Sequence, residues 1–451
     1  MEKTEQLSSC ARFLSEFSWI YNTRMTDLLI AGTLDAIPAE WVNHIDKLSD
    51  EELGKVPFGL IKNDWPPSLQ SFVSRAVELG EARFLEPSAE LVSKKMALPI
   101  AWCQGLTPKK QLELEWVAAL VADVCNTAQC KRVIDVGAGV GHLARLLHRR
   151  YGFTVLGIDC DASHLPKAQE RLQHSGCTEN IHYFTLKVDD SAATLEKVRH
   201  MLINCPDHVP CTCGEEYKSD KELTTKNRYV LVSLHGCGQL SPGLVRLFHA
   251  LTELEALVCI GCCYHKATQL DNYFPLSHEL ASLGDQWLSP DTQYQGLRLA
   301  CQELRDTWAP DREPRHLLFR ALLEVACQKY GLPWKKSRRH MARHSQLSSW
   351  DAYREHVMKD VHCHTSDERD TWCSILNRLH TRHQHQLPAV RTLTLLRQLL
   401  QPCWEGMVLG DWACWSGARL VAAFPSARSS PRNIALLLAR QPPPQQAPPR
   451  L

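Results

Sequence analysis

The residues best suited to chemistry lie in one glycine-rich segment, Val133-Ile-Asp-Val-Gly-Ala-Gly-Val-Gly-His142. An apolar, β-branched run ends there in Asp135, and three glycines follow at intervals of two residues, namely Gly137, Gly139 and Gly141. Glycine lets the backbone turn sharply and approach a ligand closely. The helix expected to follow offers free N–H groups at its N-terminus. The segment therefore predicts a binding loop for a nucleotide-like ligand.

Further acidic residues follow the next two apolar runs in the order that such a site requires. Asp159 ends the second run, where a carboxylate can accept hydrogen bonds from both hydroxyls of a ribose. Asp189 and Asp190 follow the third run, where a side chain commonly meets an adenine. Asp189 is the weaker of the predicted ligand-binding residues, because acids after strands are common.

The spacing of the glycines distinguishes two kinds of loop. A dinucleotide-binding loop more often reads G-x-G-x-x-G without a leading acid. Asp-x-Gly-x-Gly-x-Gly resembles instead the S-adenosylmethionine loop of class I methyltransferases. That resemblance implies that Asp135 helps to hold the amino group of the cofactor, and that the backbone of the loop accommodates its amino-acid and ribose portions.

The surrounding pattern predicts the elements that position this loop. Strands and helices are expected to alternate as βαβαβ, which predicts an α/β fold with a doubly wound, Rossmann-like parallel sheet. A preceding amphipathic helix is expected over 113–126. The expected strands span 133–136, 155–158, 182–188, 229–234 and 257–260, and the intervening helices span 141–150 and 163–172. The polar segment 190–227 is interpreted as an inserted loop.

The chain is predicted to have five parts. An N-terminal helical lobe precedes the Rossmann-like core, a helical insertion interrupts the core, and a C-terminal segment completes it before a Pro/Gln-rich, disordered tail. The apolar runs 407–409 and 434–438 are expected to supply the last strands. The predicted boundaries are 1–105, 106–264, 265–389, 390–440 and 441–451.

Composition narrows the class of protein. The 451 residues carry 51 basic and 50 acidic side chains, so no chain-wide attraction to nucleic acid is indicated. The 19 cysteines, an odd number in a long chain whose N-terminus has no apolar signal region, indicate reduced thiols and an intracellular protein, cytoplasmic or nuclear. The most apolar stretch, 407–425, contains Asp411 and Arg419 and is interpreted as core rather than as a membrane span.

Five short segments carry a family resemblance over most of residues 10–440. They are Thr107-Pro-Lys-Lys110, Leu234-His-Gly-Cys-Gly238, Gly261-Cys-Cys-Tyr-His-Lys266, Phe274-Pro-Leu-Ser277 and Ser430-Pro-Arg-Asn433. Together they resemble the methyltransferase-like proteins that are also called ribosomal RNA adenine dimethylase domain-containing. The resemblance implies a class I methyltransferase fold and S-adenosylmethionine as the cofactor. The chain departs from the family pattern at Leu112, Gln239 and Asp411-Trp412.

The ends of the fourth and fifth strands supply the candidate catalytic residues. Since these strands should be neighbours, His235 and Cys237 are expected near Cys262, Cys263 and His265. One reading is a thiolate nucleophile and another is a Cys/His metal site. The preferred reading is tight packing beside the cofactor, with His235 as a hydrogen-bonding residue or general base and no metal.

Adenine dimethylation is not favoured by the sequence, despite the family name. Such enzymes flip the base and accept its amino hydrogens on a loop that reads Asn or Asp, then Pro-Pro or Leu-Pro, then an aromatic residue. Leu234-His-Gly-Cys-Gly238 stands at that position instead. Lys109 and Lys110 are expected to border the cofactor or the substrate entrance.

The methyl acceptor is left open between RNA and protein. The basic run 335–343 is a weak candidate for phosphate contacts. The pair Cys211-Thr-Cys213 is interpreted as incidental rather than as metal ligands. The alternative from another class is a non-catalytic S-adenosylmethionine-binding sensor or scaffold.

Overall fold

The computed structural model describes residues 3–81, 85–173, 177–213, 227–267, 273–284, 288–302, 313–334, 349–425 and 432–440. The chain divides into two compact units. Unit 1 comprises Met1–Ser8, Ala82–Gly284 and Gly406–Leu451, and unit 2 comprises Ser9–Glu81 and Asp285–Glu405. Most of the expected N-terminal lobe and most of the expected helical insertion therefore fall in one unit. The basic run 335–343 and the tail 441–451 lie outside the described residues.

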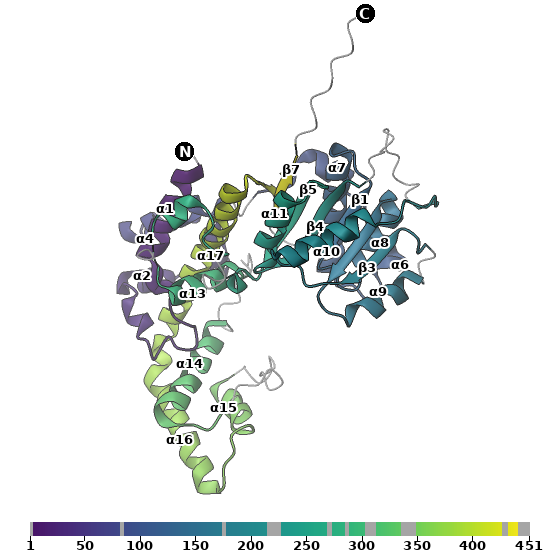
Figure 1. Ribbon diagram of the computed structural model, residues 1–451. Helices are drawn as coiled ribbons and strands as arrows, with labels where there is room; N and C mark the ends of the chain where they lie inside the picture. The colour runs from purple at the N-terminus through teal and green to yellow at the C-terminus, as the bar shows by residue number, and fades with distance from the viewer. Residues whose placement is uncertain are drawn as a thin grey trace, which may run out of the picture. The chain divides into compact units, whose positions relative to one another are not determined.

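Unit 1 is built around a seven-stranded sheet with the order β3-β2-β1-β4-β5-β7-β6 (Figure 1). The first five strands pair in parallel, and β7 is antiparallel to both β5 and β6. This topology confirms the predicted α/β class. The strands are β1 (Arg132–Val136), β2 (Thr154–Asp159), β3 (Ile181–Thr185), β4 (Tyr229–Cys237), β5 (Leu254–Cys262), β6 (Arg419–Ala422) and β7 (Ile434–Ala439).

Helices cover both faces of this sheet, as parallel strands require. One face shares a hydrophobic core with α7 (Pro108–Thr127), α8 (His142–Tyr151) and α9 (His164–Gln173). On the other face lie α10 (Ala192–Ile203), α11 (Leu240–Ala250) and the last part of α17 (Leu387–Ser416), whose Trp412 ring lies beside Gly261 of β5. The smaller helices of unit 1 are α5 (Ala89–Lys94), α6 (Ile100–Cys103), η5 (Tyr264–Lys266) and α12 (His278–Ala281).

Three expectations about elements were wrong. The third strand ends at Thr185 rather than at 188, so Asp189 lies four residues beyond it. The segment 190–227 is not simply a loop, because it contains α10. The run 407–409 belongs to α17, and the strand that it was expected to form is β6 instead. A short apolar run does not distinguish a buried helix from a strand, which explains the last error.

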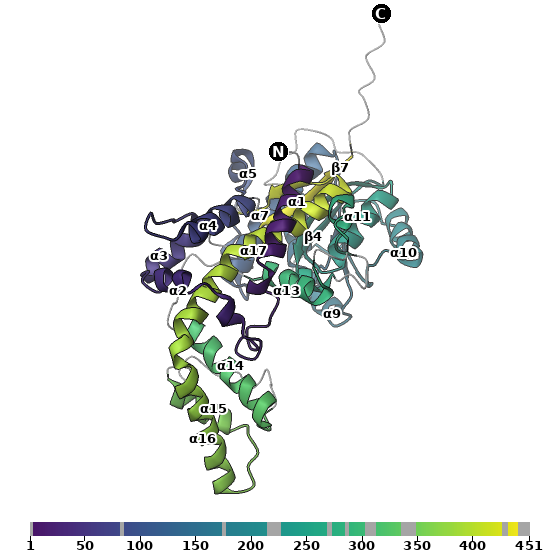
Figure 2. The same cartoon turned by 90° about the vertical axis from the view of Figure 1, so that its left-hand side faces the viewer.

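The described residues of unit 2 form helices and turns, with no strand among them. Helices α1, α2 and α4 are joined by contacts among the rings of Phe13, Phe17, Trp41 and Phe72. Figure 2 shows α14, α15 and α16 along the green part of the chain, and rings from all three of these helices are in contact. The helices are α1 (Lys3–Glu16), η1 (Ser18–Ile20), η2 (Thr33–Ala36), α2 (Ala39–Ile45), α3 (Asp50–Lys55), η3 (Val56–Phe58), α4 (Pro67–Leu79), α13 (Pro290–Ala300), α14 (Glu313–Tyr330), α15 (Trp350–Met358), α16 (Ser366–His383), η9 (Gln384–Gln386) and the first part of α17.

Among the helices that the structure describes, none combines the length and the apolar character needed to cross a membrane. The apolar stretch near the C-terminus is instead core, as expected, and it contains a buried acid. Asp411 accepts hydrogen bonds from the backbone N–H groups of Leu276 and Ser277, at 2.9 and 2.8 Å, and from the Ser277 hydroxyl at 2.6 Å. Asp411 therefore fixes the segment after β5 to α17.

We expect an Asp411→Ala substitution to destabilise unit 1 strongly. It leaves the buried N–H group of Ser277 and the half-buried N–H group of Leu276 without an acceptor, which lowers the free energy of unfolding by about 2–4 kcal/mol. Chemical denaturation measures the loss, and hydrogen exchange at the Leu276 and Ser277 amides locates it. Glu196→Ala is the control, because the Glu196 side chain is 74% exposed. Unchanged protection of both amides would contradict the anchoring role of Asp411.

Candidate functional site

The glycine loop between β1 and α8 has a conformation that requires glycine. Gly137, Gly139 and Gly141 have φ values of +80°, +56° and +77°, in the left-handed region. A Cβ atom on Gly141 would lie 2.0 Å from the hydroxyl oxygen of Tyr183, so this glycine also permits close packing on β3. A Cβ atom on Gly139 would meet nothing within 4 Å. The loop therefore leaves open space beside Gly139.

Two buried polar atoms beside the loop have no hydrogen-bond partner among the described residues. They are Oδ2 of Asp135, whose side chain ends β1 and is 2% exposed, and Oγ of Ser233 on β4. Burial raises the pKa of Asp135 to about 7. The positive charge of Lys110 opposes this rise, and the negative charge of Asp159 adds to it. Because buried polar groups are rarely left unpaired, these atoms indicate a ligand-binding site.

Asp159 at the end of β2 shapes the loop. Its Oδ2 accepts a hydrogen bond from the Gly139 N–H at 2.8 Å, and its Oδ1 accepts one from the Asp161 N–H at 2.9 Å. A ring nitrogen of His164 lies 3.1 Å from the same Oδ1. Asp159 also lines a small hollow together with Gly139 and three consecutive residues of β3, Tyr183, Phe184 and Thr185. The end of β3 thus faces this hollow through residues that the sequence analysis did not single out.

Asp189 has a local structural role in this structure. Its Oδ1 accepts hydrogen bonds from the hydroxyls of Ser191 and Thr194, at 2.5 and 2.6 Å, and these bonds lower its pKa. They support the start of α10, where Ser191 is the N-cap residue. Asp190 is ion-paired with Arg246. A contact between Asp189 and an adenine remains a prediction, and the lining residues of β3 are better placed for it.

A histidine, a lysine and a glutamate converge next to Asp135. Nε2 of His235 lies 3.2 Å from Nζ of Lys110 and 3.5 Å from Oε2 of Glu113. The start of α7 positions the last two, because Thr107 caps this helix by accepting a hydrogen bond from the Lys110 N–H. The Lys110 pKa is lowered by burial, while Glu113 acts in the opposite sense. Lys109 is exposed on the same helical turn.

Glu113 was missed by the sequence analysis. Its side chain is only 3% exposed although it carries a carboxyl group, and its position three residues after Lys110 on a helix was the available signal. The His235 side chain is 46% exposed. In the group formed by Lys110, Glu113 and His235, the carboxylate is therefore buried, the lysine is half-buried, and the imidazole can be reached by an incoming molecule.

Three thiols gather at the ends of β4 and β5, as the sequence predicted. The Sγ atoms of Cys237, Cys262 and Cys263 lie within 4.8 Å of one another, and those of Cys237 and Cys262 are 2.9 Å apart. Strand register explains the pairing, since Cys237 lies opposite Cys262. The hydrogen bond from Cys262 lowers the pKa of the Cys237 thiol to about 6. The lowered pKa favours the thiolate form of Cys237, and its exposed side chain makes the sulfur accessible.

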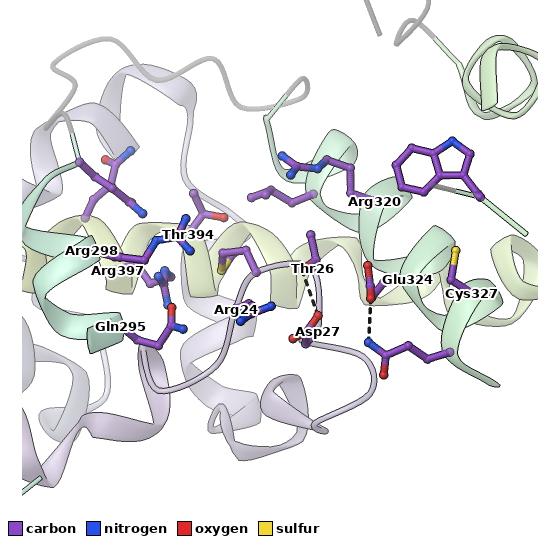
Figure 3. A pocket seen from close by; sticks show the side chains of 16 residues that line it. Arg24, Thr26, Asp27, Gln295, Arg298, Arg320, Glu324, Cys327, Thr394 and Arg397 are labelled. Atoms are coloured by element: carbon purple, nitrogen blue, oxygen red, sulfur yellow. Dashed lines mark hydrogen bonds between the residues drawn. The ribbon is translucent and has the colours of Figure 1, made fainter. Parts of the chain in front are cut away.

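A separate hollow of about 700 Å³ lies within unit 2 (Figure 3). Four arginines from different parts of the unit line it, namely Arg24, Arg298, Arg320 and Arg397. The Arg397 guanidinium is buried and donates a hydrogen bond to the Ile20 carbonyl at 3.0 Å, and burial lowers its pKa to about 10. Guanidinium groups bind carboxylates and phosphates, so the chemistry of this hollow suits an anionic group.

The carboxyl edge of the sheet in unit 1 has the features of a catalytic site that binds a nucleoside-containing ligand. Residues 109–269 match the family model described as a methyltransferase domain. Probable methyltransferase-like protein 25 from Mus musculus is 21% identical over 426 residues, covering 69% of this chain and 70% of its own length. The Homo sapiens protein of that name is 21% identical over 426 residues, covering 68% and 69%. The chain is thus similar to methyltransferase-like proteins, and residues 109–269 form a methyltransferase domain.

A solved structure of coclaurine N-methyltransferase, bound to N-methylheliamine and S-adenosylhomocysteine, is 11% identical with a TM-score of 0.26. It covers 92% of this chain and 99% of its own. The adenine dimethylase part of the family name has no counterpart in the descriptions of these matches.

We expect ligand binding to depend on the protonation of Asp135. If its carboxylate holds the ammonium group of S-adenosylhomocysteine, the acid must be ionised in the complex, so affinity falls as pH drops below the pKa of the free protein. With a pKa of about 7, the Kd should be about eightfold higher at pH 6 than at pH 7.5. Calorimetric titration at both pH values measures this ratio. Asp135→Asn, which is neutral at both, should bind more weakly and show no such change, and an equal pH dependence in this variant would contradict the assignment.

The open space at Gly139 supports a second test of the loop. We expect Gly139→Ala to cost about 1–2 kcal/mol of stability through its left-handed φ, and also to weaken binding of S-adenosylhomocysteine by at least tenfold. Gly417→Ala is a matched control, since Gly417 has φ +74° and open space around its Cα but lies far along the chain from the loop. Equal affinities in the two variants would argue against the loop as the binding site.

Proposed function

We propose that this chain binds S-adenosylmethionine at the carboxyl edge of its sheet and transfers the methyl group to an acceptor that must lose a proton. The observation that carries the proposal is the unpaired, buried Oδ2 of Asp135 beside a glycine loop with open space at Gly139. The match of residues 109–269 to a methyltransferase domain supports the same conclusion. When bound, the cofactor supplies an electrophilic sulfonium methyl group.

The residues present fit this cofactor. Asp135 offers a carboxylate to its amino group, and the N–H groups and open space of the loop suit its amino-acid portion. Asp159 has acceptor capacity left for a ribose hydroxyl, because a carboxylate accepts about four hydrogen bonds and this one makes three contacts within the protein. Phe184 offers an aromatic ring at the hollow next to Asp159, where it suits the adenine.

His235 is the residue that we assign to proton removal from the acceptor. Its Nε2 faces Lys110 at 3.2 Å and Glu113 at 3.5 Å, so this nitrogen is occupied within the protein. The imidazole is nevertheless half exposed, which leaves its other side for a substrate. Nε2 thus lies beside both the carboxylate of Glu113 and the ammonium group of Lys110. These two groups hold the imidazole in place, with its exposed side towards the substrate.

The acceptor is best sought among groups with an ionisable hydrogen, in RNA or in protein. Adenine N6 is disfavoured, because β4 ends in Leu234-His-Gly-Cys-Gly238 rather than in a loop that accepts the amino hydrogens of a base. Cys237 offers the runner-up chemistry. Its exposed thiol, whose pKa is lowered to about 6, suits covalent attack on a pyrimidine ring, for which a thiolate is the required nucleophile.

We expect His235→Asn to abolish most methyl transfer while leaving the cofactor bound. The full chain is incubated with S-adenosylmethionine carrying a labelled methyl group and with fractionated cellular RNA or protein. Loss of a general base predicts a fall of about 10²–10⁴ in kcat, with the cofactor Kd within about twofold. His249→Asn is the control, since His249 is exposed on α11 away from the loop.

The same assay separates the alternatives. A large fall with Cys237→Ser and little change with His235→Asn would replace the general-base assignment with the covalent one. Tight cofactor binding by a well-folded wild type, without transfer to any fraction, would contradict catalysis and leave a sensor or scaffold. Absence of cofactor binding would overturn the proposal entirely.

A further inference from the structure

Four potential metal ligands meet in unit 1 at the edge of the sheet opposite to the glycine loop. Nε2 of His148 and the Sγ atoms of Cys177, Cys211 and Cys213 all lie within 4.8 Å of one another. Nε2 is 3.0 Å from the sulfur of Cys177 and 3.8 Å from that of Cys211. The ligands come from α8, from the segment before β3 and from the segment after α10. Three separate parts of the chain thus bring together one imidazole and three thiols.

We propose that His148, Cys177, Cys211 and Cys213 bind one structural zinc ion. Three thiolates and one imidazole are a standard ligand set for structural zinc, whereas magnesium and calcium require oxygen ligands. With Zn–S bonds of about 2.3 Å and Zn–N bonds of about 2.0 Å, tetrahedral geometry places the ligand atoms about 3.5–3.8 Å apart. The distances between the ligand atoms in the cluster, from 3.0 Å up to at most 4.8 Å, lie on both sides of this range. Small side-chain movements therefore suffice to bring all four atoms to the zinc ion. The interpretation of Cys211-Thr-Cys213 as incidental is thereby revised.

The surroundings of the cluster hold the ligands in the orientation that a metal needs. Nδ1 of His148 lies 2.8 Å from the Phe153 carbonyl oxygen, which can only accept a hydrogen bond. Nδ1 must therefore carry the proton, and the lone pair of Nε2 points to the thiols. The Asn180 amide lies 3.7 Å from the Cys211 sulfur, at which it can donate. Hydrogen bonds of this kind fix the tautomer of a metal-binding histidine and support the thiolate ligands.

The position of the cluster indicates a structural role. His148 lies in the last turn of α8, and Asn180 directly precedes β3, so the cluster lies at the edge where the parallel strands begin. The glycine loop and His235 lie at the opposite edge, where the strands end. A closed set of four protein ligands also leaves no position for a substrate. The zinc ion would therefore hold the fold together rather than take part in methyl transfer.

The segment that carries Cys211 and Cys213 is already fixed to the sheet by polar contacts. Asn180 exchanges two hydrogen bonds with the backbone of Val209, both 2.9 Å long. Arg132 at the start of β1 pairs with Asp207 at 3.1 Å, and Thr154 at the start of β2 lies 3.1 Å from a ring nitrogen of His208. The backbone therefore presents both cysteines to His148 independently of the ion. A zinc ion would link the segment that carries Cys211 and Cys213 to α8 through His148.

Metal analysis of the purified full chain tests the proposal without any assay of methyl transfer. We expect about one zinc ion per chain, and X-ray absorption at the zinc edge should show three sulfur neighbours and one nitrogen neighbour. The zinc content should fall below about one tenth of an ion per chain in a Cys211→Ser, Cys213→Ser double variant. Cys160→Ser is the matched control, because Cys160 is an exposed cysteine of the same unit.

Other outcomes would overturn the assignment, and each is measurable on wild-type protein if the double variant fails to fold. A well-folded chain without zinc, or a zinc environment other than three sulfurs and one nitrogen, excludes the site. A disulfide among the three cysteines, detected by mass after thiol labelling, excludes it as well. Zinc that is retained in the double variant but lost in Cys263→Ser would assign the ion to the thiols of Cys237, Cys262 and Cys263 instead.

Discussion

Burial of the Asp135 carboxylate at the end of the central strand is the constraint on which the carboxyl edge of the sheet depends. A charge in an apolar environment is expensive unless it is paired, and the usual response is a raised pKa. Here the pKa of Asp135 rises to about 7, and Lys110 supplies the nearest opposing positive charge. Lys110 is itself partly desolvated, and it is stabilised by Glu113, the second buried carboxyl group. His235 contacts both Lys110 and Glu113. Keeping the charges of Asp135, Lys110 and Glu113 partly desolvated costs free energy when no ligand is bound. A cationic amino group beside Asp135 would lower this cost.

Parallel strand order brings these residues together. Since β2 and β4 flank β1, the carboxyl ends of these three strands meet at one edge, and they carry Asp159, Asp135 and His235. Helix α8 connects this edge to the other one. Its first turn follows the glycine loop, and its last turn carries His148. The helix that presents free N–H groups to a ligand is therefore the same helix that the proposed zinc ion holds at its far end. A rigid α8 would keep the loop in its ligand-binding conformation.

The sequence predicts this site where the signal is local, and it fails where the signal depends on tertiary structure. The glycine loop, Asp135 and Asp159 belong to one contiguous βαβ pattern, in which residue type and spacing follow directly from backbone geometry. Glu113 and Phe184 become recognisable only when α7 and β3 are placed beside the loop. The fold class was predictable for the same reason, since alternating strands and helices have few compact solutions. The run 407–409 was not, because three apolar residues fit a helix and a strand equally well.

The two thiol clusters show why residue type alone does not assign a role to cysteine. The sequence suggests a role for Cys237, Cys262 and Cys263, because they adjoin a histidine and a glycine loop. In the structure these three sulfurs lie within 4.8 Å of one another, and the described residues add no fourth ligand. Their pairing across β4 and β5 lowers the pKa of one exposed thiol, which favours reactivity. A strand and a helix separate Cys177 from Cys211 and Cys213 along the chain, so no spacing rule connects all three. Only folding adds His148, and with it the number and geometry of ligands that distinguish a metal site from a reactive thiol.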